Sequence, residues 1–118
     1  MTKALSPILT LALVLSCLGA PARAQLPPPL PRAKWPATVR QAVPLIIERL
    51  TPTQKALVIG TPKENLFMLQ GEWGDDIESH LGLTRGNKRL LQNTCKRVCT
   101  VDEATMLLMI ATWEVLQR

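Results

Sequence analysis

The sequence is poor in the residues on which enzymes most often depend. His80 is the only histidine among 118 residues. A Ser–His or Cys–His pair needs a histidine next to the nucleophile and a third group that orients the imidazole. Ser79 directly precedes His80, and adjacent residues on a helix do not face each other. The sequence therefore offers no catalytic residues. We expect a protein that is not an enzyme, with His80 on the surface or at a helix end.

Cysteine is scarce too, with Cys17 near the start and Cys95 and Cys99 near the end. Structural zinc takes four protein ligands, whereas Cys95, Cys99 and His80 supply three. We therefore expect neither a metal nor another cofactor. The four-residue spacing of Cys95 and Cys99 leaves two alternatives, a disulfide in an oxidising compartment or two separate thiols. A disulfide would hold the turn between the last two helices.

The apolar run near the start is short. Residues 4–17 are mostly apolar, but a membrane span needs about 20 such residues. Lys3 precedes this stretch, and the small-residue motif Ala22-Arg23-Ala24 follows it. This is the three-part pattern of a secretory signal peptide. We expect residues 1–24 to be a signal peptide and the mature protein to be periplasmic or secreted.

Residues 14–17 allow a second processing route. Their sequence, VLSC, resembles a bacterial lipobox, in which the cysteine becomes lipidated. Cleavage there would make the protein a lipoprotein anchored in the envelope through Cys17. The sequence leaves both routes open.

The net charge is small, because it falls from +5 to +3 once Lys3 and Arg23 leave with the leader. Such a mild excess identifies no partner, and export argues against nucleic acid. Residues 25–36 contain five prolines, which prevent a helix and favour an extended spacer. We expect a Pro-rich linker over 25–36, with Trp35 the first residue to dock on a helical domain over 37–118.

Residues 37–118 show no strand-like alternation and no repeat, and their pattern predicts helices. A threonine followed three residues later by Gln or Glu marks a helix start, and this happens at Thr38, Thr51, Thr61 and Thr100. Pro44 should kink the first helix or delay its start. We expect an all-α fold, a compact bundle of four to five short helices. The expected helices cover 39–50, 52–59, 62–81 (broken, or two short helices, ended by a left-handed Gly82), 88–98 with Asn87 as its cap, and 101–117.

The last helix is apolar in nearly every direction. Such a helix is either the buried centre of a bundle or is covered by a partner. A domain of about 80 residues buries only about 60% of its chain surface. Some apolar side chains of this helix should therefore be exposed in a monomer. The candidates for a partner surface are Met106, Met109, Trp113 and Leu116.

Two groups of charged residues stand out in the second half of the chain. Cations at a helix start are mildly disfavoured, so Lys88 and Arg89 hint at use in an anion-binding face. The residues of this face are Arg85, Lys88, Arg89, Lys96 and Arg97. They would bind an anionic lipid surface or an acidic protein, or they would simply be solvated. The second group is an acidic run, which consists of Glu72, Asp75, Asp76 and Glu78. We expect these carboxylates to be solvated and to lie near a helix N-terminus, where the helix dipole favours negative charge.

Residues 77–91, together with Cys95 and the segments 101–104 and 113–116, resemble the DUF6794 family of small bacterial helical domains of unknown function. The family pattern has isoleucine, a G-L-x-x-G-N segment and paired leucines, then a cysteine, a D-D/E-A helix start and a final W-x-x-L. The resemblance covers about residues 36–116 and implies a helical fold. One departure is Glu78-Ser79, where the pattern has Arg-Asn. The family brings no activity with it.

These features favour a protein-interaction module of the bacterial periplasm, which binds another envelope protein or itself. A small-ligand or metal-binding domain is the alternative, since Phe67, Met106, Met109 and Trp113 could line a pocket. A lipid-anchored envelope protein is a further alternative.

Overall fold

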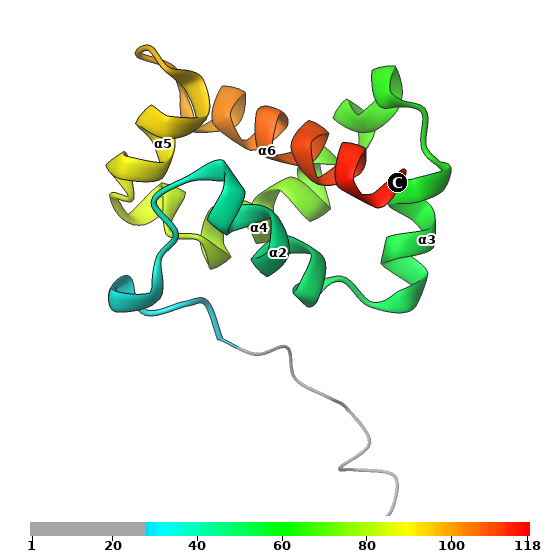
Figure 1. The fold of residues 1–118 in the computed structure, drawn as a ribbon, viewed down its shortest axis with the longest axis horizontal. Helices are drawn as coiled ribbons and strands as arrows, with labels where there is room; N and C mark the ends of the chain where they lie inside the picture. Colours follow the sequence, from blue (N-terminus) through cyan, green and yellow to red (C-terminus); the bar gives the residue numbers. More distant parts are fainter. Residues whose placement is uncertain (1–27) are drawn as a thin grey trace, which may run out of the picture.

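The computed structural model describes residues 28–118. The predicted signal peptide, Cys17 and the first linker residues lie outside the described residues. Within 28–118 the regular structure is entirely helical, so the predicted all-α class is confirmed (Figure 1). No helix in this part of the chain is long and apolar enough to cross a membrane. The α-helices are α2 (Val39–Arg49), α3 (Pro52–Gly60), α4 (Asp75–His80), α5 (Lys88–Cys95) and α6 (Val101–Leu116).

Shorter helical turns connect these helices. The 3₁₀ turns are η3 (Arg32–Lys34), η4 (Lys63–Leu69) and η6 (Leu83–Arg85), and η5 (Gln70–Gly74) is a π-helical turn. The segment predicted as one broken helix over 62–81 is thus the succession η4, η5 and α4. It ends at Gly82 in the left-handed conformation, with φ 78°, as predicted. A side chain at Gly82 would collide with the indole of Trp35.

Threonine caps explain where three of the helices begin. The hydroxyl oxygens of Thr38, Thr51 and Thr100 each accept a hydrogen bond from the amide three residues later, at 3.1 Å. The cap predicted at Thr61 is wrong. Its hydroxyl instead donates to the carbonyl oxygen of Leu57 at 2.7 Å, so Thr61 closes the end of α3 and η4 begins without a side-chain cap.

Pro44 lies inside α2 and does not delay the helix, which begins at Val39. Proline lacks the N–H that would donate to the carbonyl four residues earlier, here that of Arg40. Pro44 and Arg40 are both exposed, so this carbonyl can be hydrated. The other face of α2 carries the buried residues Ala42, Val43 and Ile46.

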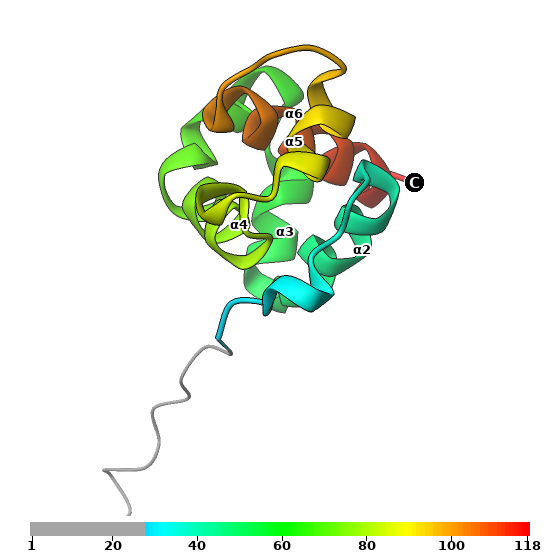
Figure 2. The ribbon, with the colours of Figure 1, turned by 90° about the vertical axis from the view of Figure 1, so that its left-hand side faces the viewer.

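Helix α6 runs through the middle of the bundle and contacts α2, α3, α4, α5, η4 and η5 (Figures 1 and 2). Its residues Ala104, Leu108 and Met109 are fully buried. Thr105 and Thr112 are also fully buried, and their hydroxyls donate to the carbonyls of Val101 and Leu108 on the same helix. These contacts explain the apolar residues on the buried side of α6, whereas Leu107 on its other side is 44% exposed.

The end of α5 differs from the prediction. The helix stops at Cys95 instead of continuing to 98, because Lys96 adopts a left-handed conformation with φ 61°. Val98, the last residue of the helix predicted over 88–98, is instead 96% exposed in the following turn. The sulfurs of Cys95 and Cys99 lie at disulfide-bonding distance across this turn, with their Cα atoms 6.3 Å apart.

The second half of the Pro-rich linker packs on the domain. The indole Nε1 of Trp35 donates to the carbonyl of Leu30 at 3.1 Å, and the amide of Leu30 donates to the carbonyl of His80 at 3.2 Å. The guanidinium carbons of Arg32 and Arg85 each lie 5.2 Å from the Trp35 ring centroid, within cation–π range. Leu30 thus docks before Trp35, which was expected to be first.

Asn87 connects this linker to the start of α5. Its side-chain oxygen accepts from the Leu90 amide at 3.3 Å, which confirms the predicted cap. Its amide nitrogen donates to the carbonyls of Pro36 and Leu81, at 3.0 and 2.8 Å. Asn87 is only 5% exposed, so these bonds satisfy a buried polar group that would otherwise be costly.

The cysteine geometry predicts that Cys95 and Cys99 contain no free thiol in protein recovered from an oxidising compartment. Denatured protein from the periplasm should take up no maleimide at these positions, and reductant should make both reactive. Reduction should also raise the intact mass by two hydrogen atoms, because the reductant supplies two electrons and each sulfur gains a proton. Full labelling of both cysteines without reductant would contradict the disulfide.

Candidate functional site

The structure excludes one of the four residues predicted as a partner surface on α6. Met109 is fully buried and belongs to the core, so its assignment to a partner surface is wrong. Met106 and Trp113 are half-buried and pack against that core. The Trp113 indole also donates to the carbonyl of Thr61 at 2.8 Å, which fixes the connection between α3 and η4. Leu116 is half-buried as well.

The five residues of the predicted anion-binding face are all exposed and lie on η6, α5 and the turn that follows. Two of them have partners within the protein. Arg85 donates to the carbonyls of Ser79 and Leu30, at 2.9 and 3.1 Å. Arg97 pairs with Glu103 at 3.2 Å, where both side chains are well exposed, so this pair contributes little to stability.

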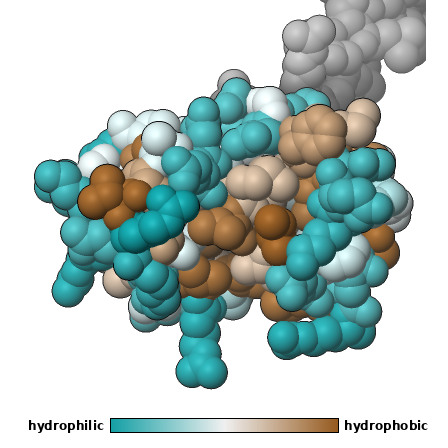
Figure 3. All heavy atoms as spheres, turned by 90° about the horizontal axis from the view of Figure 1, so that it is seen from above, coloured by the Kyte–Doolittle hydropathy of each residue, from teal (hydrophilic) through white to brown (hydrophobic). Residues whose placement is uncertain are grey.

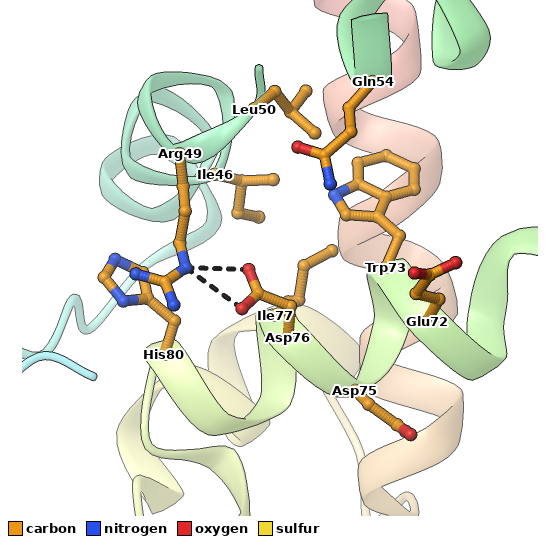
Figure 4. Close-up of a pocket in the computed structure, with 10 residues that line it drawn as sticks. All are labelled: Ile46, Arg49, Leu50, Gln54, Glu72, Trp73, Asp75, Asp76, Ile77 and His80. Carbon is orange, nitrogen blue, oxygen red and sulfur yellow. Dashed lines mark hydrogen bonds and ion pairs between the residues drawn. The ribbon is translucent and has the colours of Figure 1, made fainter. Parts of the chain in front are cut away.

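A cavity of about 340 Å³ opens between the end of α2, the start of α3 and the η5–α4 segment (Figure 4). The sequence prediction did not identify this cavity. Its walls combine four apolar side chains with polar ones. The apolar lining residues are Ile46, Leu50, Trp73 and Ile77, and the polar ones are Arg49, Gln54, Glu72, Asp75, Asp76 and His80.

The Arg49–Asp76 ion pair forms the polar end of this cavity. Arg49 Nε lies 2.8 Å from Asp76 Oδ2 and 3.1 Å from Oδ1. The Arg49 side chain is only 13% exposed, so water weakens the pair less than it would at the surface. In Figure 4 the guanidinium lies between the imidazole of His80 and the carboxylate of Asp76. The pair ties α2 to α4 and closes one end of the cavity.

His80 is the last residue of α4, as expected for a histidine at a helix end. Its Nδ1 atom is buried without a hydrogen-bond partner. Burial, and then the positive charge of Arg49, lower the pKa of His80 below 6.5. The imidazole is therefore neutral at pH 7, and it can lie beside the Arg49 guanidinium without repelling it.

A second hollow of about 170 Å³ adjoins the first and shares Leu50, Gln54, Glu72 and Trp73 with it. We call the two together the α3–η5 groove. Its second half is largely apolar, and it adds Leu57, Val58, Met68 and Leu69 to the lining. The groove therefore has a charged end at Arg49–Asp76 and an apolar end between α3 and η4.

Large apolar side chains stand exposed around the apolar end of this groove. Leu57 is 56% exposed and Met68 is 70% exposed, and both line it. Ile59 and Phe67 are also exposed, at 42% and 61%, but they do not line the groove. Clustered exposed apolar groups mark interaction sites more often than isolated ones do. The four consecutive apolar residues 66–69 are the sequence signal that could have revealed this surface, because one helical face cannot bury all four.

The acidic run divides into two kinds of residue. Glu72 and Asp75 are exposed, as expected. Asp76 instead pairs with Arg49, and the Thr105 hydroxyl, whose one proton is shared between the Val101 carbonyl and Glu78, lies 2.9 Å from Glu78 Oε1, so a solvated role is wrong for both. In residues 28–118, no three His, Cys, Asp or Glu side chains are grouped as metal ligands.

Glu78 connects α4 to the central helix at an energetic cost. Burial raises the pKa of Glu78 above 4.5, and the neighbouring Asp102 carboxylate raises it further, while the Thr105 hydrogen bond opposes the shift. The folded state therefore holds this proton more tightly than the unfolded state does. The ionised carboxylate destabilises the fold progressively as pH rises from 4.5 through the raised pKa.

The Glu78→Gln variant should therefore be more stable than wild type at pH 7, because an amide keeps an acceptor for Thr105 without the buried charge. The advantage should shrink as pH falls to 4, where the wild-type carboxyl becomes protonated. Thermal unfolding followed by circular dichroism between pH 4 and 8 measures this. Glu114→Gln, at an exposed position on α6, serves as the control. A Glu78→Gln variant less stable than wild type at pH 7 would show that the charged hydrogen bond to Thr105 dominates.

Comparison with known protein families, curated proteins and solved structures finds no match for this chain. The resemblance to the DUF6794 family accordingly stays a prediction, and any function must be inferred from the surface of this fold.

Proposed function

We propose that this protein is an exported interaction module that docks an apolar segment of another envelope protein in the α3–η5 groove. The observation that supports this most directly is the pair of exposed apolar side chains, Leu57 and Met68, that line the groove. The predicted signal peptide over 1–24 supports a periplasmic or secreted location.

The groove has the composition of a protein-binding site. Its floor contains Val58, which is buried, and Trp73 and Leu69, which are half-buried, so an occupant meets an apolar surface that is already shaped. Binding sites concentrate their affinity in apolar and aromatic contacts of this kind. An occupant that covered Leu57 and Met68 would remove their apolar surface from water, at about 25 cal/mol per Å².

The charges beside the groove favour a particular type of segment. Glu72 lines both halves of the groove, and Asp75 lines the polar half, while Asp76 is already paired with Arg49. The two exposed carboxylates therefore leave a negative rim beside an apolar floor. We infer that the partner segment presents large apolar side chains with a lysine or arginine next to them.

Self-association has support from a different surface. A shallow groove of about 790 Å³ lies between α2 and the end of α6. Val43, Ile47 and Val115 contribute apolar lining, and Pro44 and Ala111 add to it. Two cations and two carboxylates also line it, Arg40, Arg118, Glu48 and Glu114. Because these charges balance, a second copy related by a twofold axis could pair cation with carboxylate.

Site-specific photo-crosslinking in cells tests the α3–η5 groove. A photoreactive residue replacing Met68 should yield one discrete envelope-protein adduct. The same residue replacing Thr53, which is exposed on α3 outside the groove, should not. Leu57→Glu should weaken the Met68 adduct by about tenfold or more, since docking would desolvate the new carboxylate. Thr53→Glu is the matched control and should leave the adduct unchanged.

Equal adducts from positions 53 and 68, or an adduct that Leu57→Glu does not weaken, would contradict the groove as the docking site. An adduct with twice the mass of this chain would favour self-association. The same cells provide the processed chain, and an N-terminus at Gln25 would distinguish signal-peptide cleavage from lipidation at Cys17.

A further inference from the structure

Positive charge is concentrated in one segment of the described chain. Residues 79–101 contain five Lys and Arg residues and no Asp or Glu. The rest of residues 28–118 contains seven Lys and Arg residues and nine Asp and Glu residues. The net positive charge of the described chain therefore comes entirely from η6, α5 and the turn that follows.

The cations of this segment lie around two neighbouring hollows at one end of the molecule. Lys88, Lys96 and Arg97 line a shallow hollow of about 690 Å³, together with the apolar side chains of Leu91 and Val98. Lys88 also lines a second hollow, which includes Arg89 and Arg32. Lys88 thus joins the two into one basic surface, which we call the α5 face.

An exposed apolar side chain, that of Val98, lines the same hollow as Lys88, Lys96 and Arg97. Val98 is 96% exposed and occupies the turn closed by the neighbouring sulfurs of Cys95 and Cys99. Lys96 and Arg97 directly precede it, and Arg97 donates to the Val98 carbonyl at 3.1 Å. The cross-link holds the turn between α5 and α6, so this Val98 tip is displayed from a fixed support.

Figures 1 and 2 show where this end lies in the molecule. Helix α5 and η3 lie on the same side, and the described chain begins beside η3. Figure 3 shows that apolar side chains also gather over α6 on the upper face, between hydrophilic ones. The α5 face is distinct from the α3–η5 groove, with which it shares no lining residue.

We propose that the α5 face docks on an anionic phospholipid surface, with Val98 entering the headgroup region and Lys88, Arg89, Lys96 and Arg97 meeting lipid phosphates. Peripheral membrane binding combines inserted apolar side chains with cations that are attracted to anionic headgroups. The four cations are exposed and spread over a surface, and this arrangement suits a lateral array of phosphates. Arg97, whose side chain is 70% exposed, would exchange its ion pair with Glu103 for a phosphate. An acidic protein would account for these cations but would give the isolated Val98 tip no role.

This proposal adds membrane contact that does not need a lipidated Cys17. It is also independent of the α3–η5 groove, so a variant in one surface leaves the other to be tested separately. The attraction falls with ionic strength, because salt screens exposed charges.

Vesicle cosedimentation tests the proposal with the processed chain recovered from cells. The protein should sediment with phosphatidylcholine vesicles that contain phosphatidylglycerol and stay in solution with phosphatidylcholine alone. Lys88→Glu with Lys96→Glu should lower binding by at least about tenfold, since each cation near an anionic surface contributes separately. Lys55→Glu with Lys63→Glu makes the same change in net charge on α3 and η4, and it should change binding much less.

Val98→Ser tests the apolar tip without altering charge, and it should lower vesicle binding while leaving the helical circular dichroism signal unchanged. Several outcomes would overturn the proposal. These are equal losses from the two double variants, unchanged binding by Val98→Ser, or no sedimentation with phosphatidylglycerol vesicles. If the protein does not sediment with phosphatidylglycerol vesicles, and a photoreactive residue at position 92, which lines the basic hollow, forms protein adducts, the α5 face binds a protein partner instead.

Discussion

The fold depends on the need to bury the apolar side chains of one helix. Helix α6 is apolar around nearly its whole circumference, and water contact along its length would forgo most of the free energy of burial. The remaining α-helices contain 6 to 11 residues, and helices this short are marginal in isolation. Packing against α6 therefore gives them their stability, and each needs only one apolar face. Their outer faces, including the α3–η5 groove and the α5 face, are not needed for this packing.

Specific contacts hold the N-terminal segment and α5 at the same end of the molecule. Gly82 has the left-handed conformation that a turn needs and leaves room for the Trp35 indole against the backbone. Asn87 then bonds both the linker, at Pro36, and the end of the preceding segment, at Leu81. These contacts leave Lys88 and Arg89 exposed where α5 begins. Helix-end cations, which the dipole mildly disfavours, are thus held at the tip of the molecule.

Local signals in the sequence were sufficient for the fold class and for the starts of α2, α3, α5 and α6. Thr38, Thr51 and Thr100 act through bonds spanning three residues, which a sequence displays directly. Thr61 fails because the same hydroxyl can also bond backward to Leu57, and only the packing of α3 decides between the two. The left-handed Lys96 that ends α5 is equally hidden, since lysine carries no preference for that conformation.

The candidate site could not be predicted from short stretches of sequence, because it too depends on how distant segments pack. Arg49 and Asp76 are 27 residues apart, and nothing in either neighbourhood indicates the pairing. The choice between Met109 and Leu107 as the buried residue of α6 depends on which side faces its neighbours. A helix that is apolar all round does not reveal this. From the sequence, α6 could therefore be either the buried centre of the bundle or a helix covered by a partner.

The central claim is that the side of α6 that carries Leu108 and Met109 is the shared core of the bundle and not a surface for a partner. Thermal unfolding of Met109→Glu and Leu107→Glu tests it most directly, because these positions are 0% and 44% exposed on the same helix. A buried, unpaired carboxylate costs several kcal/mol, a large part of the stability of a small domain. Met109→Glu should therefore lose the helical circular dichroism signal, while Leu107→Glu should unfold close to the wild-type temperature. A folded Met109→Glu variant with wild-type stability would contradict this account.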